Sequence, residues 1–163
     1  MPTTLTALAT VVDPAQAMRV DTVSGTGFQV TFDVANQTGD RAGPSPTESI
    51  LAALAACTSM DVGSILRKKR QPPTSYRIAV TGEKQDEHPQ VYTGIVVEHR
   101  VTGDVEPEAL RRAVELSATT YCPVSAMLSH SVRIEHRYTL TKPDGEEVRA
   151  LVVITGPEGP QVS

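Results

Sequence analysis

A long apolar segment with clear helix start and stop signals constrains the fold of this 163-residue chain most strongly. Ser45-Pro46-Thr47-Glu48 is a capping box with proline at the first helical position, so it predicts a helix that begins near Pro46. The basic run 67–70 and the pair Pro72-Pro73 predict its end, because cations complement the carboxyl end of a helix and proline stops one. The first half of the helix is apolar on every side, and we therefore expect it to be buried on more than one face.

Patterns on both sides of this helix predict strands and shorter helices. Alternating and β-branched residues over 4–12 and 18–34, interrupted by Asp13-Pro14 and a glycine-containing turn at 24–27, predict three antiparallel strands before it. The elements expected after it are a hairpin (76–81 with 91–101), two short helices (107–117 and 123–129) and two closing strands (131–141 and 148–154) around a Pro143-Asp144-Gly145 turn.

This order of elements segregates the helices from an antiparallel sheet, which is typical of an α+β fold. A chain of this length fits one domain, and we expect that domain to span residues 1–155. The last residues, 156–163, are rich in glycine and proline and predict a flexible tail.

Composition and charge exclude several classes of function. A net charge of −4 and an isoelectric point near 5.5 argue against nucleic-acid binding, because phosphate recognition needs a concentrated positive face. The amino terminus has no secretory pattern and apolar residues form no long uninterrupted stretch, so we expect a cytoplasmic protein that does not enter a membrane. The sequence also lacks a glycine-rich phosphate loop, a Gly-x-Ser-x-Gly elbow and a His/Cys cluster at zinc spacing.

The two cysteines differ in their surroundings, and this difference bears most directly on function. Cys57 lies within the apolar helix, where a thiol behaves as a small hydrophobe unless a cation reaches it. Cys122 directly precedes Pro123 at a helix start, which favours the thiolate. Because cytoplasmic thiols are kept reduced, a cysteine pair there indicates transient chemistry more often than a structural disulfide. From the residues alone, Cys57 is more simply a packed core thiol, and Cys122 is the reactive one or a buried cap residue.

Three segments resemble the OsmC/Ohr family: Gly-Pro-Ser-Pro-Thr-Glu at 43–48, Leu-Ala-Ala-Leu-Ala-Ala-Cys-Thr-Ser-Met-Asp-Val at 51–62, and Leu-Ser-Ala-Thr-Thr-Tyr-Cys-Pro-Val-Ser at 116–125. The resemblance includes both cysteine motifs, their separation and the order of strands and helices up to about Thr141. Residues 61–70 are most similar to the OsmC-like branch of the family rather than to the organic hydroperoxide resistance branch.

The resemblance implies an OsmC-like fold, an intertwined homodimer with active sites at the subunit interface, and a role in oxidative stress defence. It implies a thiol peroxidase that reduces organic hydroperoxides, with hydrogen peroxide as a further candidate substrate. In the family's scheme the thiolate at the position of Cys57 attacks the peroxide and becomes a sulfenic acid, Cys122 condenses with it to form a disulfide, and an external dithiol reductant resets the pair. Neither a metal nor a flavin is needed. The family assigns the attack to Cys57, although the helix start favours Cys122, and we follow the family.

Two further residues receive roles from the resemblance. The family's glutamate corresponds to Glu48, and its arginine comes from the region before the long helix, where Arg19 and Arg41 are the candidates and Arg41 is favoured. In a straight helix Glu48 and Cys57 lie about 13 Å apart along the axis and on opposite sides, so Glu48 would act on Cys57 of the partner subunit or through a bend. The simpler interpretations are that Glu48 only caps the helix and that Arg41 is a solvated loop charge.

Two other classes of function remain open. One is a non-catalytic redox-sensing or small-ligand-binding dimer with the same fold, because the activating arginine is not settled by the sequence. The other is a structural interaction module whose cysteines are merely buried. Sustained, cysteine-dependent consumption of a peroxide distinguishes the enzyme from both.

Overall fold

Two units make up the chain in the computed structural model, Met1–Ile50 and Leu51–Ser163, and each is described by itself. The residues described are 3–12, 14–15, 19–34 and 40–163. The single domain expected over 1–155 stays a prediction.

The first unit contains a three-stranded antiparallel sheet, in the order β1 (Ala7–Val11), β2 (Val20–Ser24) and β3 (Gln29–Phe32). This confirms the three antiparallel strands expected before the helix. At the predicted turn between β2 and β3, the amide of Gly27 donates to the carbonyl of Ser24 at 2.8 Å, and Gly27 has a φ of 90°, which glycine adopts without strain. Asp13, part of the other predicted turn, lies outside the described residues.

The long helix α1 runs from Pro46 to Lys68, and its ends are built as the sequence predicts. Glu48 accepts a hydrogen bond from the amide of Ser45 at 2.7 Å, and the amide of Glu48 donates to the Ser45 hydroxyl at 3.3 Å, which completes the capping box. At the other end Arg70 adopts a φ of 60°, and the amide of Gln71 reaches the carbonyl of Leu66 at 3.0 Å. These contacts form the usual helix-terminating motif, with arginine in the position where glycine is most common.

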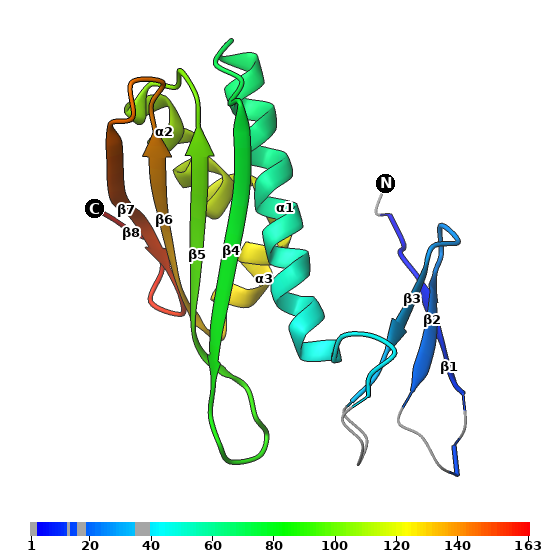
Figure 1. The fold of residues 1–163 in the computed structure, drawn as a ribbon. Coiled ribbons are helices and arrows are strands. Elements are labelled where there is room, and N and C mark those ends of the chain that lie inside the picture. Colours follow the sequence, from blue (N-terminus) through cyan, green and yellow to red (C-terminus); the bar gives the residue numbers. More distant parts are fainter. Residues whose placement is uncertain (1–2, 13, 16–18, 35–39) are drawn as a thin grey trace. The chain divides into compact units, whose positions relative to one another are not determined.

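The second unit is built on a five-stranded sheet in the order β4-β5-β6-β7-β8 (Figure 1). Its strands are β4 (Ser75–Lys84), β5 (Tyr92–Thr102), β6 (Arg133–Thr141), β7 (Glu147–Thr155) and β8 (Gln161–Val162). The predicted hairpin is β4 with β5. The expected flexible tail includes β8, which is hydrogen-bonded to β7.

One pair of neighbours in this otherwise antiparallel sheet, β5 and β6, is parallel. Parallel neighbours need a long crossover, and here the crossover consists of α2 (Pro107–Leu116), the π-helical turn η1 (Ser117–Tyr121) and α3 (Pro123–Ser129). The helix expected over 107–117 therefore ends one residue early, and a π-helical turn follows it. The α+β architecture is confirmed.

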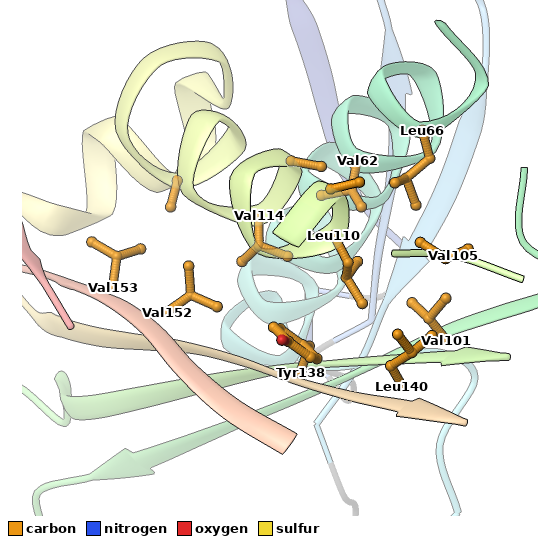
Figure 2. Close-up of a cluster of buried hydrophobic side chains, with 13 residues drawn as sticks. Val62, Leu66, Val101, Val105, Leu110, Val114, Tyr138, Leu140, Val152 and Val153 are labelled. Carbon is orange, nitrogen blue, oxygen red and sulfur yellow. The ribbon is translucent and has the colours of Figure 1, made fainter. Parts of the chain in front are cut away.

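Two adjoining clusters of buried side chains hold the helices against one face of the sheet. In the larger cluster, Val62 and Leu66 of α1 and Leu110 and Val114 of α2 pack on sheet residues that include Leu140 (Figure 2). The smaller cluster includes Leu54, Cys57, Ile95, Val97, Cys122 and Ile134. Both cysteines thus belong to the part of the core between α1 and the sheet.

Helix α1 buries one of its faces against the rest of the second unit. Its fully buried side chains are Leu54, Thr58, Val62 and Leu66, whereas Ile50 and Met60 are 38% and 72% exposed. Packing within the second unit buries one face of the helix, and burial of a further face stays a prediction. Length and composition would also allow α1 to cross a membrane, but its buried stripe packs on a sheet, as the central helix of a soluble fold does.

Candidate active site

The sulfur atoms of Cys57 and Cys122 lie close together, although the two residues are far apart in the sequence. These two sulfurs and a carboxylate oxygen of Asp61 all lie within 4.8 Å of one another. Both cysteines are free thiols; Cys57 is half-buried and Cys122 is 2% exposed. The fold therefore brings together the two cysteines that the sequence singles out and adds a carboxylate to them.

The π-helical turn and the proline that follows it determine where Cys122 lies. The amide of Cys122 donates to the carbonyl of Ser117 at 2.9 Å, which closes the π turn. Cys122 then adopts an extended conformation, as the residue before a proline prefers, and Pro123 begins α3. The amide of Ser125 donates to the Cys122 sulfur at 3.3 Å, so Cys122 caps α3 with its thiol. The predicted cap position is confirmed.

The protonation state of Cys122 differs from the one expected at a helix start. Burial raises the pKa of Cys122 to about 12, and a hydrogen bond to Cys57 adds to the rise. The amides of Ser125 and Val124 lower this pKa but do not offset burial. The expected bias of Cys122 toward the thiolate is therefore wrong: the two amides at the start of a seven-residue helix weigh less than removal of the sulfur from water.

A buried hydroxyl pair holds the Asp61 carboxylate. Ser117 donates to Oδ2 of Asp61 at 3.0 Å, and the Ser117 hydroxyl lies 2.9 Å from that of Thr58. Thr58 and Ser117 are fully buried, whereas Asp61 is half-buried. None of these three residues was a predicted site residue. The signal that would have found Asp61 is its spacing of four from Cys57, which places both on one face of a helix.

A cleft of about 480 Å³ opens beside Asp61. Helix α1 contributes Asp61, Ile65, Lys68 and Lys69 to its walls, and Leu116 and Tyr121 come from the segment that leads to Cys122. The cleft therefore has one acidic end, two basic side chains and an apolar wall. It offers solvent a route to the carboxylate that lies within 4.8 Å of both sulfurs.

Among the charged residues predicted to assist Cys57, Arg41 pairs with Glu48 and Arg19 pairs with Asp21, all within the first unit. Nη1 of Arg41 lies 3.4 Å from Oε2 of Glu48, and Arg19 lies 3.4 Å from Asp21. Both ion pairs are at least partly exposed, and Glu48 is also the capping-box residue. The catalytic roles of Arg41 and Glu48 remain predictions.

A second set of buried polar side chains, Tyr76, His99 and His136, lies on the inner face of the sheet. Tyr76 and His99 are hydrogen-bonded at 2.7 Å between Oη and Nδ1. Among the described residues, Nε2 of His99 and both ring nitrogens of His136 have no hydrogen-bond partner. Burial lowers the pKa of His99 to about 3 and that of His136 to about 4, and both rings are therefore neutral near pH 7.

Comparison with known proteins gives a consistent set of relatives. The sequence profile of the OsmC-like protein family matches residues 37–137. Protein YhfA of Escherichia coli K12 is 41% identical over 116 residues, which cover 71% of this chain and 84% of YhfA. A hypothetical protein from Aquifex aeolicus has a TM-score of 0.75 at 26% identity, covering 86% of this chain and 98% of that one. The organic hydroperoxide resistance protein OhrB of Bacillus subtilis has the same fold, with a TM-score of 0.58 at 16% identity over 83% of this chain and 98% of OhrB.

Proposed function

This chain belongs to the OsmC-like family, and on that premise we propose that it is a cysteine-based peroxidase that reduces organic hydroperoxides. The observation that carries the proposal is the approach of the Cys57 and Cys122 sulfurs to within 4.8 Å, with both thiols free. Two thiols at this separation need only a small movement to form a disulfide. The fold shared with a protein named for organic hydroperoxide resistance supports the choice of substrate class.

The proposed reaction has three steps. The Cys57 thiolate attacks the outer oxygen of the hydroperoxide, the O–O bond breaks, and the alkoxide takes a proton from solvent to leave as an alcohol. The Cys57 sulfenic acid then condenses with the Cys122 thiol, and this forms a disulfide and releases water. A dithiol reductant, in the cytoplasm by our proposal, reduces the disulfide and is itself oxidised.

Burial of the two sulfurs supports attack by Cys57. Cys57 is half-buried, so a peroxide can approach it, whereas Cys122 lies almost wholly inside the core. The raised pKa of Cys122 keeps that residue a neutral thiol, which suits a resolving group. The hydrogen bond to Cys57 adds to the rise in the pKa of Cys122, so Cys122 is the residue that keeps its proton.

The Asp61 carboxylate makes a nearby cation necessary, because two like charges oppose each other at this separation. We propose that Arg41, held by Glu48, supplies the cation to Cys57 of the partner subunit. The Arg41–Glu48 ion pair supports this proposal, because it holds the two predicted residues beside each other.

The exposed face of α1 supports a homodimer. Several apolar residues of this helix remain exposed in one chain, among them Ile50, Ala56 and Met60. Such a face on a helix that carries the attacking cysteine fits a second copy of the chain. Met60→Asp should therefore shift the dimer toward a monomer in light scattering and lower peroxide turnover, whereas Val162→Asp, an equal change at an exposed position of β8, should do neither. A monomeric wild-type protein would exclude the dimer.

Steady-state peroxide consumption tests the function. With dihydrolipoamide as reductant, the wild-type protein should consume an alkyl hydroperoxide over many turnovers, and Cys57→Ser should abolish this. Cys122→Ser should react once and accumulate the sulfenic or sulfinic acid, which mass spectrometry detects. No Cys57-dependent turnover with any of several alkyl hydroperoxides or hydrogen peroxide would exclude a peroxidase.

One observation favours a second candidate, a redox-sensing dimer that is oxidised without turnover. The group that accompanies the sulfur pair is a carboxylate, which slows thiolate attack if the partner subunit brings no cation. A single slow oxidation to the Cys57–Cys122 disulfide, with no sustained consumption of peroxide, would select this candidate.

A further inference from the structure

We propose that the reduced protein binds one thiophilic divalent cation, of the class of Zn²⁺ or Cd²⁺, through the sulfurs of Cys57 and Cys122 and the carboxylate of Asp61. This goes beyond the proposed peroxide reduction. It uses the same residues but requires neither a peroxide nor a reductant.

The separations of the three ligand atoms suit one small ion. All three atoms lie within 4.8 Å of one another. Ligand atoms around a tetrahedral zinc ion lie roughly 3.5–4 Å apart, so side-chain movements of about 1 Å complete the arrangement. Cys57 and Asp61 are four residues apart on one face of α1, and Cys122 comes from the start of α3. Two elements of the same unit therefore converge on a single point.

The chemistry of the donor set selects the kind of ion. Two thiolates and one carboxylate favour zinc or cadmium over magnesium or calcium, which prefer oxygen ligands throughout. Binding replaces two thiol protons by one divalent cation, so the two protons are released to solvent. The bound cation also offsets the electrostatic repulsion among the two thiolates and the carboxylate.

Hydrogen bonds already orient two of the three ligands. Ser117 donates to Oδ2 of Asp61 at 3.0 Å, and the amide of Ser125 donates to the Cys122 sulfur at 3.3 Å. Such outer contacts fix the direction of ligand atoms in metal sites. The cleft of about 480 Å³, which Asp61 lines, opens the carboxylate side of the cluster to ions and water.

A bound ion and a peroxide exclude each other at this site. A sulfur whose electron pair is shared with a metal ion is a poorer nucleophile, and a Cys57–Cys122 disulfide has lost both thiolate donors. Oxidation of the pair therefore releases the ion, and the ion protects the reduced pair.

Titration of the reduced, metal-free protein with Cd²⁺ alone tests the proposal. We expect one equivalent to produce the ultraviolet sulfur-to-cadmium charge-transfer band, and excess chelator to remove it. The protein oxidised to the disulfide should give no band. Asp61→Asn keeps both sulfurs and should weaken binding by roughly tenfold or more, whereas Asp104→Asn, the same change at an exposed site, should leave binding unchanged.

A second measurement does not depend on cadmium spectroscopy. One equivalent of Zn²⁺ should slow alkylation of Cys57 in the wild-type protein and protect it much less in Asp61→Asn. Equal affinity of the wild-type protein and Asp61→Asn, or a band that persists in the Cys57→Ser variant, would overturn the proposal. Because no assay uses a peroxide, binding without peroxide turnover would leave this inference standing while excluding the peroxidase.

Discussion

Ser117 donates a 3.0 Å hydrogen bond to Asp61 from the first residue of the π-helical turn, and its hydroxyl is also paired with that of Thr58 at 2.9 Å. Ser117→Ala removes both contacts and leaves the fully buried Thr58 hydroxyl without this partner. We expect the free energy of unfolding to fall by about 1–3 kcal/mol, as urea denaturation will measure.

The double variant Thr58→Val/Ser117→Ala separates the hydroxyl pair from general packing. Replacement of both hydroxyls leaves no buried hydroxyl unpaired there, and the loss at Asp61 is common to both variants, so the double variant should be more stable than Ser117→Ala alone. Additive losses from the two changes would show that the pair contributes nothing as a unit.

The two roles open to Glu48 can be separated by one substitution. Glutamine also completes a capping box, so Glu48→Gln should lower the free energy of unfolding by at most about 1 kcal/mol, chiefly through the exposed ion pair with Arg41. If Glu48 positions Arg41 for the reaction, kcat/KM for an alkyl hydroperoxide should nevertheless fall by about 10- to 100-fold. Unchanged turnover in a stable variant would assign Glu48 to helix capping alone.

Local signals predicted the elements that depend on neighbouring residues. The capping box at Ser45 and the prolines at 72–73 bracket α1, and Pro123 marks the first residue of α3. The family resemblance predicted that Cys57 and Cys122 act together in one site. Each of these signals acts within one or two helical turns or rests on a motif.

Features that depend on distant residues were not predictable from the sequence pattern. The parallel pairing of β5 with β6 depends on the path of the crossover between them. The strand β8 forms by hydrogen bonding to the edge of β7. The helix start at Cys122 was visible, but its burial under α1 was not, and burial determines its pKa. The spacing of four residues places Asp61 beside Cys57 on α1, but its approach to Cys122 and Ser117 depends on the fold.

Arg70 offers a test of the end of α1. Its φ of 60° is unfavourable for a residue with a side chain but not for glycine. Arg70→Gly should therefore raise the free energy of unfolding by about 0.5–1 kcal/mol. The control is Arg67→Gly, in the last turn of the helix, which should lower it by about 1 kcal/mol. A loss of stability in Arg70→Gly would show that the arginine side chain contributes more than the strained backbone costs.

The buried histidines predict a loss of stability in acid. The pKa values of His99 and His136 are lowered by burial to about 3 and 4, so below about pH 6.5 the unfolded chain binds protons that the folded chain does not. The stability that the neutral rings provide is complete above pH 6.5 and declines as the pH falls toward 4, by up to about 1.4 kcal/mol per pH unit for each histidine. His136→Leu should therefore reduce the slope of unfolding free energy against pH, measured by urea denaturation, whereas His130→Gln, at an exposed position, should leave it unchanged. Carboxylates such as Glu98, whose pKa is lowered by its hydrogen bond from Arg100, affect all three proteins equally. An identical slope in His136→Leu and the wild-type protein would mean that His136 takes up its proton as readily in the folded protein as in the unfolded one.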